Sequence, residues 1–166
     1  MKKLVFGAAL ACCLLLTGCA QTLLKDKIAE GTVTELPTLT VQAGGETVEA
    51  KEGSYTWEYD WGIGSSTKEK VTTAHALERK EFIPTLTTAE KELTLSFSEG
   101  CDSFTVQRWS DAYWDQPEAE AEEVTVAENA LTLLPGGYIY EITAEWTSAQ
   151  THRGTAEYAI HVTVTE

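Results

Sequence analysis

Hydrophobic and polar residues alternate over short stretches of the chain from about Pro37 onwards. Successive side chains of a strand point to opposite faces, so this period of two predicts β-strands with one buried face. The clearest stretch is 138–146, whose alternate positions hold Tyr138, Tyr140, Ile142, Ala144 and Trp146. The last stretch, 155–164, alternates in the same way. We predict that the two form a hairpin across 147–154, with their apolar residues facing one interior.

Turn residues separate these stretches at short intervals. Gly44-Gly45 is typical of a hairpin with a two-residue turn, and Glu128-Asn129 separates two further short strands. Short strands joined by Gly, Asn and Asp turns indicate an all-β fold, an antiparallel sandwich or barrel. Residues 62–90 lack clear alternation, and we expect there a long connection that carries an edge strand or a turn of helix.

The beginning of the chain has the order of a secretory signal. Lys2 and Lys3 precede an apolar segment, 4–16, which is too short to span a bilayer. The following Leu16-Thr17-Gly18-Cys19 resembles the lipobox of bacterial lipoproteins. That resemblance implies that Cys19 receives a diacylglyceryl group on its sulfur and that a signal peptidase cuts before it. The alternatives are an ordinary secretory signal with an incidental cysteine, and an uncleaved anchor.

These features divide the chain into three parts. We predict a signal peptide at 1–18, a lipidated cysteine and flexible tether at 19–36, and a β-sandwich domain at 37–166. Two acyl chains hold a protein on a membrane stably, where a single chain holds it only marginally. We therefore expect an extracytoplasmic protein that membrane lipid anchors through Cys19.

The charge of the chain excludes some partners. The 166 residues include 12 basic and 26 acidic side chains, a net charge of −14, and loss of residues 1–18 would make it −16. Such a surface repels nucleic acid and favours a soluble, monomeric domain. Cys12 and Cys13 leave with the signal and Cys19 is lipidated. Cys101 is then alone, so we expect no internal disulfide and a structural role for this residue.

The assembled segments resemble a known but functionally uncharacterised family. They are "PTLTVQAGGETVEAKEGSYTWEY", "AHALE", "SFTVQRWSDAYW" and "LLPGGYIYEITAEW…RGTAEYAIHV", and they cover about 37–164. Similar extracytoplasmic domains occur in Gram-positive gut anaerobes, in lipoproteins and appended to membrane metallopeptidases of the β-lactam-sensor type. Ala76 and Cys101 depart from the family pattern, in which proline is usual at both positions. The chain has no H-E-x-x-H motif, so the resemblance does not imply peptidase activity.

The strand after "LPGG" also resembles the tyrosine corner of immunoglobulin-like and fibronectin type III domains. In those domains a tyrosine near the start of the penultimate strand ties back to a preceding corner. Tyr138 or Tyr140 could serve. This resemblance implies an Ig-like sandwich.

Aromatic residues in "RWSDAYWDQPE" are the first candidates for a binding site. Trp109, Tyr113 and Trp114 lie where a strand runs into a polar loop, with no obvious buried partner. Exposed rings could stack on a sugar, and the alternative is that they fold back over the end of the sandwich. We expect Trp57, Trp61 and Trp146 to pack in the core, because they share strand faces with other bulky residues.

Acidic residues supply two weaker candidates. Asp111, Asp115 and Glu118 lie close in sequence but lack the spacing of a calcium loop. Glu58 and Asp60 share the polar face of one strand, as a carboxylate-dependent hydrolase would require. The remaining titratable candidates, His75, His152 and His161, show no zinc or catalytic-triad spacing.

Taken together, the sequence predicts a non-enzymatic binding or interaction module that needs no cofactor. Its partner would be a protein or a glycan at the cell surface. The glycan alternative uses Trp109 and Trp114, and the hydrolase alternative uses a carboxylate pair.

Overall fold

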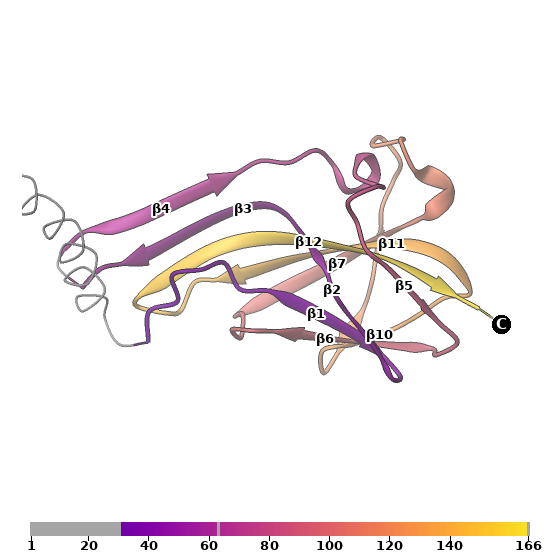
Figure 1. Cartoon of the computed structure of the whole chain (residues 1–166), viewed down its shortest axis with the longest axis horizontal. Helices are drawn as coiled ribbons and strands as arrows, with labels where there is room; N and C mark the ends of the chain where they lie inside the picture. The colour runs from indigo at the N-terminus through magenta and orange to yellow at the C-terminus, as the bar shows by residue number, and fades with distance from the viewer. Residues whose placement is uncertain (1–30, 63, 166) are drawn as a thin grey trace, which may run out of the picture.

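The computed structural model describes residues 31–62 and 64–165, and it shows an all-β sandwich of two sheets (Figure 1). The five-stranded sheet has the order β2 (Glu46–Glu49), β1 (Leu39–Ala43), β6 (Glu92–Phe97), β10 (Ala130–Thr132) and β9 (Val126–Ala127). The seven-stranded sheet has the order β4 (Ser66–Val71), β3 (Lys51–Asp60), β12 (His152–Val164), β11 (Gly136–Trp146), β7 (Ser103–Ser110) and β8 (Glu122–Glu123), with β5 (Thr85–Thr88) also beside β12.

Part of the predicted organisation falls beyond these ranges. The signal peptide at 1–18, Cys19 and the tether up to residue 30 lie outside the described residues. Within the described ranges, no helix has the length and apolar character needed to cross a membrane.

The predicted hairpins are confirmed. Ala43 pairs with Glu46 across Gly44-Gly45, which leaves a two-residue turn between β1 and β2. Glu128 and Asn129 connect β9 to β10 with φ values of 52° and 64°, the left-handed conformation that tight hairpin turns require.

Strands β11 and β12 form the longest hairpin, as the alternation predicted. They pair without interruption from Gly136 opposite Val164 to Trp146 opposite Gly154. This hairpin lies in the middle of the seven-stranded sheet, with β7 on one side and β3 on the other (Figure 1). The sheet is therefore organised around it.

The core lies between the inner faces of the two sheets and is rich in aromatic rings. The largest buried side chains there are those of Trp57, Trp146, Tyr140 and Tyr158. The rings of Trp57 and Trp146 meet edge to face with centroids 5.5 Å apart. Each such ring removes ~150–250 Å² from water. The aromatic residues of β11 thus stabilise the fold, as predicted, and do not form a surface strip.

The connection 62–90 contains both an edge strand and a turn of helix, the two alternatives that the sequence left open. It begins with edge strand β4, which hydrogen-bonds to β3 alone. Residues 72–84, which we call the strap, include the 3₁₀ turn η1 (Ala76–Glu78) and lead into β5. Strand β5 pairs in parallel with the end of β12, a pairing that no pattern in the sequence indicates.

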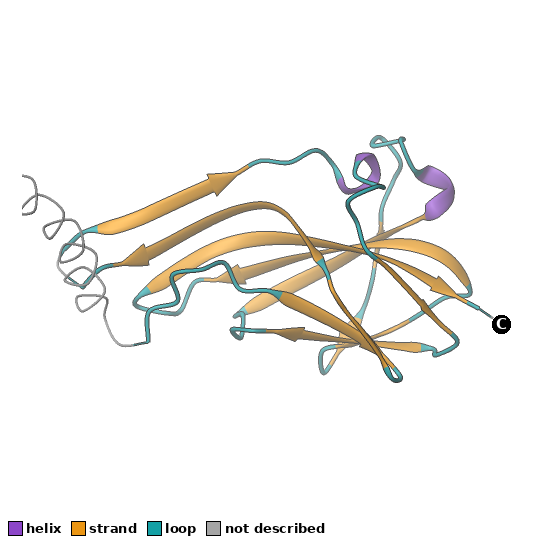
Figure 2. Ribbon diagram, viewed as in Figure 1, coloured by secondary structure: helices purple, strands orange, loops and turns teal. Residues whose placement is uncertain are grey.

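The strap covers part of the outer face of the seven-stranded sheet. The 3₁₀ turn η2 (Asp111–Tyr113) lies near η1 in Figure 2, and the backbone N–H of Asp115 donates to the carbonyl of Leu77. A second, smaller hydrophobic cluster forms beneath, made of Ala76, Leu77, Ile83, Trp109, Ile139 and Ala159. One end of the sheet is therefore buried on both faces.

Packing on the sandwich begins before Pro37, the predicted start of the domain. Val33 and Leu36 are partly buried against the main core. The indole N–H of Trp57 donates to the carbonyl of Val33 at 3.2 Å, and the hydroxyl of Tyr158 donates to the carbonyl of Pro37. The last part of the predicted tether therefore belongs to the folded body.

Among the described residues, no hydrogen bond that meets normal geometry ties Tyr138 or Tyr140 to the preceding corner. The hydroxyl of Tyr140 is buried without a hydrogen-bond partner among the described residues, and the ring of Tyr138 contacts the guanidinium of Arg108. The hydroxyl that ties a strand to an earlier corner is instead that of Tyr158 in β12.

Candidate functional site

Trp109, one of three aromatic residues predicted to face a ligand, is buried. Its side chain is 4% exposed and packs under the strap, and its indole N–H donates to the carbonyl of Ala119 at 3.1 Å. The ring of His75 meets it edge to face at 5.1 Å. In this structure Trp109 offers no ring face to a sugar, because the strap covers the outer face of the sheet.

The other two aromatic residues lie at the surface of the same loop. Tyr113 in η2 is 44% exposed. Trp114 is partly buried against the ring of His161, with the ammonium of Lys80 5.9 Å from its centroid. A ligand-binding role for these two rings stays a prediction.

The acidic residues of the loop 109–118 do not converge. Asp111 lies 3.4 Å from Nε2 of His161, whereas Asp115 contacts the strap through its backbone N–H. In the described part of the chain, no group of three or more histidine, cysteine or acidic residues is placed to hold a metal ion.

Cys101 lies beside the core with a free thiol. It is partly buried, and this burial raises the pKa of the thiol above its usual value. A raised pKa keeps the sulfur protonated at neutral pH, where a nucleophile would need to be a thiolate. This environment fits the structural role that the sequence predicted.

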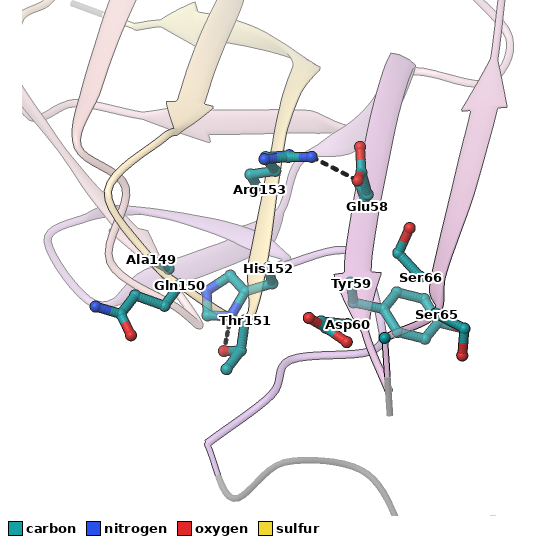
Figure 3. A pocket seen from close by; sticks show the side chains of 11 residues that line it. Glu58, Tyr59, Asp60, Ser65, Ser66, Ala149, Gln150, Thr151, His152 and Arg153 are labelled. Atoms are coloured by element: carbon teal, nitrogen blue, oxygen red, sulfur yellow. Dashed lines mark hydrogen bonds and ion pairs between the residues drawn. The ribbon is translucent and has the colours of Figure 1, made fainter. Parts of the chain in front are cut away.

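A polar pocket of about 320 Å³ lies where the β3–β4 and β11–β12 connections meet at one end of the sandwich (Figure 3). We call it the loop-end pocket. Its lining comes from the end of β3, the start of β4 and the β11–β12 turn: Glu58, Tyr59, Asp60, Gly64, Ser65, Ser66, Ala149, Gln150, Thr151, His152 and Arg153. The pairing of β12 with β3 brings the two connections together.

One wall of the pocket is a fixed ion pair. Arg153 of β12 donates to Glu58 of the neighbouring strand β3 at 2.6 Å. This hydrogen bond lowers the pKa of the Glu58 carboxyl below its usual value, and Glu58 raises the pKa of the guanidinium in turn. Both groups therefore stay charged at neutral pH, and the wall presents paired charges of opposite sign.

Other lining residues carry groups with unused hydrogen-bonding capacity. Asp60 receives the backbone N–H of Gly62 on Oδ1 at 2.8 Å, and no described residue donates to its Oδ2. The side-chain amide of Gln150 makes no hydrogen bond with any described residue, and Figure 3 shows it on the β11–β12 turn, pointing away from Asp60. These two groups supply one strong acceptor and an amide that both donates and accepts.

Aromatic rings lie beside these polar groups. Tyr59 lines the pocket, and its ring centroid is 5.6 Å from that of Trp61. The indole N–H of Trp61 donates to the hydroxyl of Thr67 at 2.7 Å, which fixes this ring at the start of the β3–β4 connection. The pocket therefore combines ring surface with a carboxylate, an amide, hydroxyls and a guanidinium.

The sequence identified part of this pocket and missed the rest. Glu58 and Asp60 were candidates as a carboxylate pair, and the structure places both in the lining. The sequence pattern places Gln150 and Thr151 only in a turn between two strands. Knowing the strand order would have assigned them to this pocket, because the pairing of β12 with β3 brings the two connections side by side.

The chain gives no match to a family model, to a curated protein or to a solved structure.

Proposed function

We propose that the protein is a membrane-anchored, extracytoplasmic binding module that recognises a glycan in the loop-end pocket. The observation that carries this proposal is that Asp60, Gln150 and Tyr59 all line one open pocket. Sugar hydroxyls donate and accept at once, so they pair with carboxylates and amides. The C–H face of a sugar ring packs on an aromatic ring, and a few polar groups fix its orientation.

The electrostatics of the pocket support binding over hydrolysis. A glycosidase needs one carboxylic acid whose pKa is raised, so that it is protonated when the bond breaks. Arg153 lowers the pKa of Glu58, which is the opposite effect. Glu58 is therefore suited to hold Arg153 in place and not to act as a general acid.

The position of the pocket fits a lipid anchor at Cys19. The described chain begins at the same end of the sandwich as the β3–β4 and β11–β12 connections (Figure 1). Eleven residues, 20–30, separate Cys19 from the described part, and a chain of that length spans at most ~40 Å. An anchored protein would thus hold the pocket close to the membrane, where glycans near the membrane surface are within reach.

Replacing the lipobox cysteine tests the anchor. We expect Cys19→Ala to abolish labelling by radioactive palmitate and to move the protein from the membrane fraction or leave its precursor uncut, because the lipobox thiol that would be acylated is removed. The measurement is labelling in cells followed by fractionation, and Cys101→Ala is the matched control that should label normally. Labelling that survives Cys19→Ala would refute the anchor.

Replacing Asp60 and Gln150 tests whether the pocket binds a glycan. We expect Asp60→Asn and Gln150→Ala each to weaken binding, the first by ~10-fold or more, because a hydrogen bond to a charged group contributes ~1.5–3 kcal/mol. The measurement is calorimetric titration of the full-length protein with a panel of neutral oligosaccharides that includes N-acetylglucosamine oligomers.

Trp114→Ala distinguishes a glycan site in this pocket from one in the loop 109–118, which the sequence indicated. It lies outside the pocket, so we expect it to bind the same saccharides as the unchanged protein. Loss of binding in Trp114→Ala, with binding retained in the Asp60 and Gln150 variants, would move the glycan site to the loop 109–118. Absence of binding to every saccharide of the panel would overturn the glycan proposal.

A further inference from the structure

A second pocket, independent of the loop-end pocket, opens beside Phe82. It measures about 300 Å³, and we call it the Phe82 notch. It forms where β4 has ended and β3 continues alone at the edge of the sheet, with the strap on the other side. Its lining residues are Lys51, Glu52, Gly53, Tyr55, Val71, Thr73, Arg79 and Phe82.

The notch gathers the exposed apolar surface of the protein. Large hydrophobic side chains are clearly exposed at only three positions of the described chain, and two of them, Phe82 at 70% and Val71 at 39%, line this pocket. Tyr55 adds a partly buried ring. Apolar surface that converges in a hollow, with polar groups beside it, is typical of a ligand site.

The polar group of the notch is a buried guanidinium. Arg79 is 7% exposed, and its Nη1 donates to the carbonyl of Glu52 at 3.0 Å. Its Nε and Nη2 have no hydrogen-bond partner among the described residues. These two nitrogens form the side-on fork of the guanidinium, which matches the two oxygens of a carboxylate.

The neighbouring carboxyl groups do not occupy this fork. Arg108 and Arg153 form ion pairs at 2.9 and 2.6 Å, whereas Arg79 forms none with the described residues. Glu157 accepts the backbone N–H of Ser54 at 3.2 Å, and Glu52 pairs with Lys51 at 3.7 Å. Glu141 interacts with Arg79 through space but makes no hydrogen bond or ion pair with it. Arg79 is thus the charge of the lining that forms no ion pair, and a buried charge without a paired group is costly.

From this arrangement we infer that the Phe82 notch binds a carboxylate carried on an apolar group, with the fork of Arg79 on the carboxylate and Phe82 and Val71 on the apolar part. The size of the pocket limits the ligand to a small aryl or alkyl acid or to the apolar last residue of a peptide. Nε and Nη2 are covered in the unliganded protein, so Phe82 and the strap must shift slightly to admit the ligand.

The chain offers a direct test because it contains three arginines, Arg79, Arg108 and Arg153. Full-length protein with isotope-labelled arginine, held in a lipid nanodisc, gives one Nε signal for each, and Arg→Lys variants assign them. We expect hydrocinnamate to shift the Nε signal of Arg79 saturably. The signals of Arg108 and Arg153, which are already paired with carboxylates, should stay in place and serve as internal controls.

Matched probes separate the two parts of the inference. Acetate lacks the ring and hydrocinnamyl alcohol lacks the carboxylate, so each should bind at least ~10-fold more weakly. A short peptide ending in phenylalanine, with a free or an amidated C-terminus, distinguishes a peptide ligand from a free acid. Phe82→Ala should weaken hydrocinnamate ~10-fold, whereas Tyr113→Ala, an exposed aromatic outside the notch, should not change it.

Two results would overturn the inference. The first is an Arg79 signal that hydrocinnamate leaves unshifted, which would mean that the guanidinium is satisfied within the protein. The second is equal binding of the acid and the alcohol, or binding that Phe82→Ala leaves unchanged. Neither result bears on the loop-end pocket, so saccharide binding there would stand.

Discussion

Trp57→Ala is expected to remove ~3–5 kcal/mol from the free energy of unfolding, the usual cost of truncating a fully buried tryptophan. Trp57 has no exposed surface, and its ring packs edge to face on Trp146 and lies 5.5 Å from the ring of His152. The variant also loses the hydrogen bond from the indole to the carbonyl of Val33. The measurement is equilibrium denaturation followed by circular dichroism.

The hydrogen bond from Trp57 to Val33 predicts a second effect, which is confined to the residues before β1. Val33 is held on the sandwich partly by this indole, so Trp57→Phe should keep most of the core packing and still release residues 31–36. Faster backbone hydrogen exchange confined to that segment would show the release. Tyr113→Ala is the control for an exposed ring and should change stability by less than ~0.5 kcal/mol. A loss below ~1 kcal/mol for Trp57→Ala would contradict the observed packing.

Alternation predicted the strands well where one face of the sheet is buried and the other is open. Strand β6 is such a case, because Leu93 and Leu95 are buried and their neighbours are exposed. Turn chemistry predicted the connections at Gly44-Gly45 and Glu128-Asn129 for an equally local reason, since only certain residues adopt a positive φ at low cost. Local physics therefore sufficed for the strands and for most hairpins.

Alternation fails in β4 because nothing covers either of its faces. Its residues are almost all exposed, so burial imposes no period of two on the sequence. The parallel pairing of β5 with β12 fails for another reason. It joins segments 76 residues apart, such as Thr85 opposite His161, and no turn residue encodes a contact between distant segments.

The burial of Trp109 shows the same limit, because the sequence left open whether its ring faces a ligand or folds back onto the sandwich. The sequence shows no buried partner for its loop, since the strap that covers it is distant in the chain and lacks alternation. The loop-end pocket also depends on strand order, since Asp60 and Gln150 become neighbours only when β3 and β12 pair. Residue types indicated binding chemistry, and topology decided which residues share a site.

Glu141→Gln is expected to make the protein more stable at neutral to alkaline pH. Glu141 lies in β11 on the outer face of the sheet, beside Glu157 and Arg79. Burial first, and the Glu157 carboxylate second, raise the pKa of Glu141 to about 7 from 4.5, and Arg79 partly offsets both. The folded protein thus binds a proton at this site that the unfolded chain releases near pH 4.5.

The sign of the pH dependence follows from that difference. Below about pH 4.5 both states hold the proton, so Glu141 costs nothing there. As the pH rises to about 7, the unfolded chain ionises first, and the folded state loses up to roughly 3 kcal/mol relative to acidic conditions. Glutamine keeps the shape without the titration, so its advantage should grow between these two pH values and then level off.

Denaturation midpoints of the two proteins across about pH 4 to pH 9 measure this directly, because the difference between the two curves cancels the titrating groups that do not interact with Glu141. Glu145→Gln is the matched control, since Glu145 lies on the same strand and face but is exposed. Its curve should run parallel to that of the unchanged protein. Parallel curves for Glu141→Gln as well would mean that the carboxyl is solvated.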